Sequence, residues 1–178
     1  KDFEVINPSN EEPFAVILAD DLCIDSEFNL LSRMIEIYEK YHCSIIAVED
    51  IPFSKIENYG VVSGDLIDET EDIFRVTNMK EKPNSNDLID FIPDQSSVDN
   101  LTTFKGIIGR YILTPEIFNI LQNIQPSNNG EIQITDALLE QAKKGKVIAL
   151  KFDGIRFDCG SIKGFLDATN YFANNLKQ

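Results

Sequence analysis

The sequence predicts an α/β protein with a doubly wound, mixed but mainly parallel sheet. Two apolar runs, residues 14–18 and 43–48, have the composition of strands that are buried on both faces. Between these runs, apolar residues from Phe28 to Tyr38 recur at helical spacing, and the helix is expected to end near His42. A strand, a helix and a second strand in this order predict a right-handed parallel βαβ unit.

Later segments extend this alternation of strands and helices. Residues 61–62 and 73–79 are apolar segments separated by a polar turn, which predicts a hairpin or meander laid against the sheet. Thr114 and Pro115 predict the start of a short helix, and Thr135 is expected to cap the next one. Further elements are expected as strands at residues 107–113, 147–152 and 155–157, a closing helix at about residues 162–176, and a long polar loop at residues 84–103.

Length and composition favour a globular protein of one domain, or a part of a larger one. The chain has 178 residues, of which 43% are apolar, enough for a hydrophobic core. Its 30 Asp and Glu outnumber 16 Lys and Arg, so the surface as a whole repels nucleic acid and anionic lipid. A ligand that carries phosphate would therefore need a local basic site or a metal ion.

No segment of the sequence predicts export or membrane insertion. The N-terminus lacks the pattern of a signal peptide, and no apolar run approaches the roughly 20 residues that span a bilayer. We expect a cytoplasmic protein that binds neither a membrane nor nucleic acid. Three cysteines without Cys-x-x-Cys spacing and the single histidine, His42, argue against a zinc site and against a catalytic triad built on another histidine.

Two adjacent carboxylates follow the first predicted strand directly. Asp20 and Asp21 would lie at its carboxyl end, the edge at which open α/β sheets bind ligands. A carboxylate there can hold Mg²⁺ while substrate phosphates supply the remaining ligands. We assign Asp20 as the metal ligand. The alternative is that Asp21 or Asp25 only caps the following helix.

A second candidate segment is Lys80-Glu81-Lys82-Pro83, at the end of the predicted hairpin. Glu81 offers a carboxylate for sugar hydroxyls and Lys82 offers an ammonium for phosphate. Adjacent strand residues point to opposite faces, so both side chains can serve one site only if the strand bends. Pro83 favours an extended backbone at Lys82. The alternative is an ordinary solvated turn.

Two further positions complete the candidate site. Gly60 precedes a strand, where a missing Cβ would let a ligand approach the backbone, although a simple turn explains it equally well. Asp158 follows a short strand and could share the metal with Asp20 if the two strand ends meet, or it could cap a helix near Ser161. Candidates for phosphate contacts that could equally be surface charges are Arg110, Arg156 and Lys163.

The order of several motifs is more specific than any one of them. From Glu12 onward the chain reads E-P-F-A-V-I-L-A-D-D, Y-G-V-V, E-K-P, I-I-G-R-Y-I-L-T-P, G-E-I-Q-I-T-D-A and R-F-D-C-G-S-I-K-G-F. This succession resembles the bacterial UTP:glucose-1-phosphate uridylyltransferases, or UDP-glucose pyrophosphorylases, of the sugar nucleotidyltransferase family. The resemblance covers nearly all of the chain after residue 11.

The resemblance implies a Rossmann-like fold of the nucleotide-diphospho-sugar transferase type and a known reaction. An oxygen of glucose 1-phosphate would attack the α-phosphorus of UTP, giving UDP-glucose and pyrophosphate, with Mg²⁺ and without a covalent enzyme intermediate. Residues 1–178 would form a partial nucleotidyltransferase domain, with the upstream nucleotide-binding loop absent.

The resemblance also implies a role for each candidate residue. Asp20 matches the metal-binding aspartate of the family, and Asp158 matches a second metal ligand of related enzymes. Gly60 corresponds to the backbone near the sugar, and Glu81 to the ligand of the glucose hydroxyls. Lys82 corresponds to the contact with the sugar phosphate, so Asp20 and Lys82 would be the catalytic residues.

The chain departs from the family pattern in four ways. It lacks the Gly-rich loop that cradles the nucleotide phosphates, and the stretch between residues 83 and 109 is longer than usual. Residues 104–106 read Phe-Lys-Gly, and residues 160–163 replace the usual Gly-Asp-Lys-Leu, so Lys163 has no secure equivalent. Because a sheet without its leading strands exposes an unpaired edge, we expect the chain alone to be inactive and to need an upstream fragment, a swapped strand or self-association as a homo-oligomer.

Three alternatives remain open at this point. A sister nucleotidyltransferase using dTTP, ATP or CTP would share the sheet and the acidic and Glu-Lys motifs. A glycosyltransferase would also place an acidic pair after a strand to bind the metal of a nucleotide-sugar. A fragment with a purely regulatory or assembly role would bind no UDP-glucose through Asp20.

Overall fold

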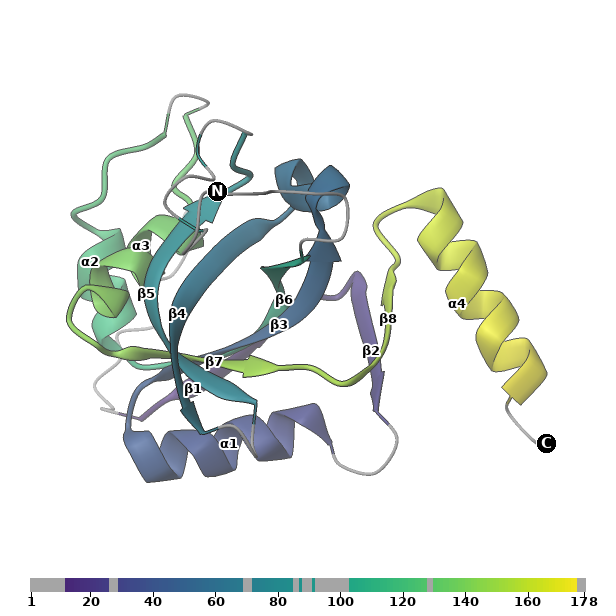
Figure 1. Ribbon diagram of the computed structural model, residues 1–178, viewed down its shortest axis with the longest axis horizontal. Helices are drawn as coiled ribbons and strands as arrows, with labels where there is room; N and C mark the ends of the chain where they lie inside the picture. The colour runs from purple at the N-terminus through teal and green to yellow at the C-terminus, as the bar shows by residue number, and fades with distance from the viewer. Residues whose placement is uncertain are drawn as a thin grey trace, which may run out of the picture.

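The computed structural model describes residues 12–25, 29–68, 72–84, 87, 91, 103–127 and 130–175. A six-stranded sheet forms its centre and has the strand order β1-β6-β3-β7-β5-β4, with β4 pairing additionally with β6 (Figure 1). Its strands are β1 (Phe14–Ile17), β3 (Ser44–Pro52), β4 (Gly60–Asp68), β5 (Ile73–Glu81), β6 (Thr103–Leu113) and β7 (Val147–Lys151).

A separate two-stranded sheet pairs β2 (Asp21–Asp25) with β8 (Gly154–Asp158). The helices are α1 (Leu30–Tyr41), η1 (Phe53–Asn58), α2 (Glu116–Leu121), α3 (Ile134–Ala142) and α4 (Ile162–Asn175). Figure 1 shows α4 beside β8, on the opposite side of the molecule from α2 and α3. None of the helices in the described segments is both long and apolar enough to cross a membrane.

The mixed sheet with helices on its two faces confirms the predicted α/β class. The prediction that most strands pair in parallel is wrong for the described strands. Among them, only β3 and β7 pair in parallel, with Ser44 opposite Val147. β1 and β3 are not neighbours, because β6 lies between them and pairs antiparallel with both. The local pattern around β1 and β3 contains no information about a strand that arrives some 60 residues later in the chain.

The prediction that residues 14–18 are buried on both faces is also wrong for this chain. β1 alternates between half-buried and exposed residues, and the side chain of Ile17 is 53% exposed. The strand pairs on one side with β6 and forms an edge of the described sheet. β3 behaves as predicted, since its residues from Ser44 to Val48 are all buried.

Helix α1 is capped differently from the sequence prediction. The Oδ1 atom of Asn29 accepts a hydrogen bond from the backbone N–H of Leu31 at 3.0 Å, so neither Asp21 nor Asp25 is the N-cap. At the other end His42 adopts a left-handed conformation with φ of 50°, as the residue that follows a helix often does. His42 therefore has the structural place expected for it.

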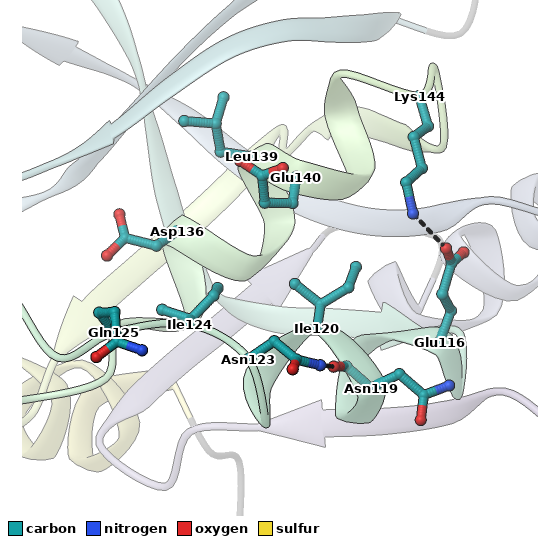
Figure 2. Close-up of a pocket in the computed structure, with 10 residues that line it drawn as sticks. All are labelled: Glu116, Asn119, Ile120, Asn123, Ile124, Gln125, Asp136, Leu139, Glu140 and Lys144. Atoms are coloured by element: carbon teal, nitrogen blue, oxygen red, sulfur yellow. Dashed lines mark hydrogen bonds and ion pairs between the residues drawn. The ribbon is translucent and has the colours of Figure 1, made fainter.

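Helices α2 and α3 lie side by side and line a cavity of about 730 Å³ (Figure 2). Its apolar wall consists of Ile120, Ile124 and Leu139. Lys144 Nζ and Glu116 Oε1 form an ion pair at 2.8 Å across its rim. Helix α2 begins at Glu116, and Pro115 occupies its cap position without a side-chain hydrogen bond. The Thr114 hydroxyl accepts from Gln141 Nε2 at 2.9 Å.

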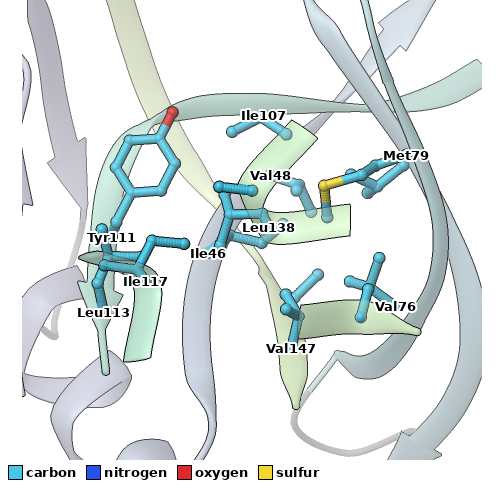
Figure 3. Packing of buried hydrophobic residues seen from close by; sticks show 14 of the residues in the cluster. Ile46, Val48, Val76, Met79, Ile107, Tyr111, Leu113, Ile117, Leu138 and Val147 are labelled. Carbon is cyan, nitrogen blue, oxygen red and sulfur yellow. The ribbon is translucent and has the colours of Figure 1, made fainter. Parts of the chain in front are cut away.

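The core lies on both faces of the central sheet. Alternate residues of β3 and β7 contribute to each face, because successive side chains of a strand point in opposite directions. On one face Ile46 and Val48 pack with residues of α2 and α3, as Figure 3 shows. On the other, Ile45 and Ala47 pack against Met34 of α1.

The hairpin of β4 and β5, the strands β7 and β8 and the closing helix α4 all lie where the sequence predicted them. Most of the loop at residues 84–103 lies outside the described residues.

Candidate functional site

A cavity of about 830 Å³ lies between the central sheet, the β2–β8 sheet and the first turn of α3. It is lined by the five residues to which the sequence analysis assigned a role in metal or substrate binding. These residues come from four separate parts of the chain and are Asp20, Gly60, Glu81, Lys82 and Asp158. None of them lines the cavity between α2 and α3. The structure therefore brings the candidates together in one place.

The carboxylates of Asp20 and Asp158 converge at one side of this cavity. Asp20 lies in the turn between β1 and β2, and its carbonyl accepts from the Cys159 N–H at 2.7 Å. A Cβ atom built on Gly160 would lie 3.0 Å from Asp20 Oδ2 and 3.1 Å from Asp158 Oδ1. Asp158 Oδ1 also accepts from the Gly160 N–H at 3.1 Å. Both carboxylates thus point at the same small space.

Two carboxylates with room for further oxygen ligands fit the preference of Mg²⁺, which usually binds one or two protein carboxylates together with water and substrate phosphates. Within the described parts of the chain, no group of three or more His, Cys, Asp or Glu residues is placed to hold a metal ion. The donor set of Asp20 and Asp158 suits a metal that is shared with a phosphate ligand rather than enclosed by protein.

Asp21 has a different environment from its neighbour. It is buried, and its Oδ2 atom accepts from the backbone N–H of Gly109 at 2.7 Å. Its Oδ1 atom forms an ion pair with Nε of Arg156. The close approach requires glycine, because a Cβ on Gly109 would lie 2.7 Å from Asp21 Oδ2 and 2.6 Å from Leu18 Cβ. Asp21 therefore anchors the turn that presents Asp20, rather than capping α1.

Glu81 and Lys82 line the same cavity although they are adjacent in sequence. This is possible because Lys82 adopts a left-handed backbone with φ of 44°, which bends the chain at the end of β5. The extended conformation predicted for Lys82 is wrong. Its N–H donates to the Tyr59 carbonyl at 2.9 Å, and this tertiary hydrogen bond overrides the local preference imposed by Pro83.

Thr135 orients the carboxylate of Glu81. Its Oγ1 atom donates to Glu81 Oε2 at 2.6 Å. The predicted role of Thr135 as a helix cap is wrong, because α3 begins one residue earlier and Gln133 occupies the cap position without a side-chain bond. Gly60 lies opposite Glu81 in the β4–β5 register, and a Cβ there would lie 3.0 Å from Glu81 Oε2. Its missing side chain leaves room for this carboxylate.

Arg156 is the centre of a polar network in the wall of the cavity. Its side chain is only 11% exposed, so it is not the surface charge that the sequence allowed. Besides Asp21, its Nη1 atom contacts Glu49 Oε1 at 2.8 Å and the Tyr59 hydroxyl at 2.9 Å, and the guanidinium lies 5.3 Å from the centre of the Tyr59 ring. Burial lowers the pKa of Arg156, but the hydrogen bond and charge of Asp21, together with Glu49, raise it overall. Arg156 stays charged.

The hydroxyl groups of Tyr59 and Tyr111, which line the cavity, remain protonated. Burial, reinforced by the charges of Glu81 and Asp21, raises the pKa of Tyr111 to about 12. Burial also raises the pKa of Tyr59, against the opposing effect of Arg156. Sequence reasoning missed Glu49, Tyr59 and Thr135. The last two lie in the Y-G-V-V and G-E-I-Q-I-T-D-A motifs, which were the available signal.

The other two basic candidates do not serve as free phosphate contacts in this structure. Arg110 donates to the carbonyls of Leu18 at 3.2 Å and Gly109 at 3.0 Å, and it also reaches the carbonyl of Asp21, so it holds the turn between β1 and β2. Lys163 lines the cavity but pairs with Asp167 at 2.5 Å.

Comparison with known proteins places the chain in a family. Residues 3–175 match the protein family described as nucleotidyl transferase. The chain belongs to the nucleotidyl transferase family. Within this family it is 47% identical over 167 residues to a UTP–glucose-1-phosphate uridylyltransferase of Pseudomonas aeruginosa, a match that covers 93% of this chain and 54% of the relative. A Bacillus subtilis uridylyltransferase is 36% identical over 168 residues, covering 94% and 52%.

Solved structures of nucleotidyl transferases agree with these matches. An apo UDP-glucose pyrophosphorylase superposes with a TM-score of 0.77 at 43% identity, covering 93% of this chain and 56% of the other. A UDP-glucose pyrophosphorylase complexed with UDP-glucose superposes with a TM-score of 0.79 at 41% identity, covering 94% and 58%. The predicted family and its mixed α/β fold are thereby confirmed. The chain spans about half the length of the curated relatives it matches.

Proposed function

We propose that the protein containing this chain transfers a uridylyl group from UTP to glucose 1-phosphate, forming UDP-glucose and pyrophosphate. The observation that carries this proposal is one cavity with a converging carboxylate pair on one side and a glutamate and lysine on the other. The names of the relatives and the UDP-glucose complex of a structural neighbour support the choice of nucleotide and sugar. We also propose that residues 1–178 form the sugar-phosphate and metal half of the nucleotidyltransferase domain.

The roles of the residues follow from their chemistry. Glu81, held by Thr135, accepts hydrogen bonds from glucose hydroxyls, and the ammonium of Lys82 binds the phosphate of glucose 1-phosphate. Asp20 and Asp158 would hold Mg²⁺, which when bound neutralises charge on the nucleotide phosphates. This chain therefore contributes to catalysis by positioning two reactants and offsetting their charge.

The reaction is a direct in-line displacement. A phosphate oxygen of glucose 1-phosphate forms a bond to the α-phosphorus of UTP, while the bond from that phosphorus to the bridging oxygen breaks and pyrophosphate leaves. Lys82 restrains the attacking phosphate and reduces its repulsion from UTP. No protein nucleophile is required.

An edge strand and exposed apolar residues support the expectation that further polypeptide covers part of this surface in the active protein. β1 is an edge strand of the described sheet, and the exposed fractions of Ile17, Ile162 and Phe165 are 53%, 84% and 59%. An upstream segment or a second copy in a homo-oligomer would bury these residues. We place the protein in the cytoplasm, where its phosphorylated substrates would be available. Light scattering combined with gel filtration tests the oligomer, since a compact, active monomer of residues 1–178 would contradict it.

The test of the reaction is Asp20→Ala in the protein that contains this chain. Pyrophosphate release from UTP and glucose 1-phosphate should fall by at least about a hundredfold, the effect expected when a principal electrostatic contact is lost. Asp153→Ala, an exposed carboxylate in the turn between β7 and β8, is the matched control and should behave like wild type. Retained turnover in Asp20→Ala would remove the metal role.

The same assay separates the other candidate functions. Pyrophosphate release that requires dTTP, ATP or CTP in place of UTP would identify a sister nucleotidyltransferase and contradict the proposal. Glucose transfer from UDP-glucose to an acceptor, without formation of UTP from added pyrophosphate, would identify a glycosyltransferase. Titration of UDP-glucose with Mg²⁺ in a calorimeter should show Asp20-dependent binding, whereas a purely regulatory or assembly fragment would show none.

A further inference from the structure

The two halves of the candidate site belong to different sheets. Asp20 directly precedes β2 and Asp158 is the last residue of β8, whereas Glu81 and Lys82 lie at the end of β5 in the central sheet. In-line displacement needs the metal and the sugar phosphate at a fixed separation, and a displacement of about 1 Å can cost about a hundredfold in rate. Something must therefore fix the two sheets relative to one another at the cavity.

Arg156 is placed to do this. It lies two residues before Asp158 on β8, so both side chains project from the same face of that strand, and both line the cavity. From there its guanidinium reaches Glu49 of β3 at 2.8 Å and the hydroxyl of Tyr59 at 2.9 Å. Its remaining contact, with Asp21, holds the turn that presents Asp20.

Tyr59 continues the connection to the sugar side. Its carbonyl accepts the N–H of Lys82 at 2.9 Å, which stabilises the left-handed bend that aims Lys82 into the cavity. The next residue, Gly60, pairs with Glu81 in the β4–β5 register. A continuous chain of contacts thus runs from Asp21 through Arg156 and Tyr59 to the segment that presents Glu81 and Lys82.

Arg156 also compensates negative charge in the cavity. A cavity that receives phosphates is lined by the carboxylates of Asp20, Asp21, Glu49, Glu81 and Asp158. Arg156 pairs with two of them, Asp21 and Glu49, both of which lie mostly out of solvent at 8% and 24% exposure. Without Arg156 these two charges would be uncompensated and would repel the substrates.

We propose that Arg156 is a positioning residue, which ties the β2–β8 sheet to the rim of the central sheet and so sets the separation between the metal carboxylates and the sugar-phosphate contacts. This inference rests on the proposed function. Arg156 touches no substrate in this role and acts through Asp21, Tyr59 and Glu49. Its guanidinium suits the task because Nε donates to Asp21 on one sheet while Nη1 donates to Glu49 on the other, a geometry that the ammonium of lysine cannot reproduce.

The first test is Arg156→Lys, which keeps the charge and loses the fork of donors. We expect kcat/KM for glucose 1-phosphate to fall about 10- to 100-fold and the half-saturating Mg²⁺ concentration to rise about tenfold, as is typical when a residue that orients metal ligands is changed. Arg75→Lys is the matched control, because Arg75 is a half-buried arginine that donates to the Gly145 carbonyl away from the cavity. A lower Tm with unchanged Mg²⁺ dependence and unchanged KM would overturn the proposal and leave Arg156 purely structural.

The second test, Tyr59→Phe, keeps the ring and removes only the hydroxyl that Arg156 contacts. The KM for glucose 1-phosphate should rise about fivefold, corresponding to the loss of one hydrogen bond, with a smaller change in kcat. Tyr38→Phe on α1 is the control and should leave KM unchanged. If Tyr59→Phe has the wild-type KM, the connection to the sugar side is wrong, and this result decides the matter even if Arg156→Lys fails to fold.

Failure of this inference differs from failure of the proposed function. If the wild-type protein releases no pyrophosphate, the proposed function fails. Calorimetric binding of UDP-glucose with Mg²⁺ in the same variants then still tests whether Arg156 links the two sheets. If wild type is active and both variants match it, only the role of Arg156 is overturned.

Discussion

Two adjacent aspartates should have opposite phenotypes. Asp20 is exposed, and its carboxylate faces the space near Gly160 that suits a metal ion, whereas Asp21 is 8% exposed and bonded to Gly109 and Arg156. We expect Asp20→Ala to abolish Mg²⁺-dependent binding of UDP-glucose while changing the free energy of unfolding by no more than about 0.5 kcal/mol, as for a surface substitution. Asp21→Ala should mainly destabilise the fold.

The magnitude for Asp21→Ala follows from its contacts. Removing one partner of a buried ion pair costs about 3–5 kcal/mol, and the lower end applies because Arg156 keeps Glu49. The Gly109 N–H would also lose its acceptor, which costs about 1–3 kcal/mol. Both losses arise from one carboxylate and do not add fully, so we expect about 4 kcal/mol. This is a large share of the roughly 5–15 kcal/mol that stabilises a domain.

Asp21→Asn provides a milder variant that should remain folded. The amide oxygen can still accept from Gly109, but the NH2 group then replaces the oxygen that accepts from Arg156 Nε, and the charge is lost, so a cost of about 3 kcal/mol is expected. Urea unfolding followed by far-ultraviolet circular dichroism measures the stability of each variant, and calorimetry measures binding. The reasoning would be refuted if Asp20→Ala lost as much stability as Asp21→Asn, or if Asp21→Ala unfolded with the wild-type midpoint.

Three further predictions concern the sugar side and the acid response. Thr135→Val removes the donor to Glu81 and should raise the KM for glucose 1-phosphate about fivefold, measured by steady-state kinetics, with stability nearly unchanged. Lys82→Gly should lose turnover but gain up to about 1 kcal/mol in urea unfolding, because glycine tolerates the left-handed backbone; a less stable variant would contradict the assigned strain. Burial raises the pKa of Asp50, but the hydrogen bonds and charges of Lys105 and Lys151 lower it overall. This stabilisation is therefore present above the unfolded pKa near 4 and is lost as the pH falls through the lower folded value, so Asp50→Asn should flatten the acid limb of the stability curve.

The sequence by itself determined the elements whose identity depends on local pattern. β3 and β7 are continuous apolar runs and are buried on both faces of the sheet, as such runs predict. The β4–β5 hairpin and α4 also follow from alternation and helical spacing. An acidic pair after a strand, together with an ordered set of motifs, was sufficient to find the family and five candidate residues that line one cavity.

Only the tertiary structure determined which strands are neighbours and which contacts each candidate residue makes. It placed β6 between β1 and β3, and it gave the carboxylates of Asp20 and Asp21 different environments. It also bent the chain at Lys82 against the preference set by its proline neighbour. Each decision depends on contacts between residues far apart in the chain, such as Arg156 with Asp21 across 135 positions and Thr135 with Glu81 across 54. Spacing along the sequence fixes which way a side chain points within its own strand or helix, but the hydrogen-bond partner it meets there is supplied by another segment.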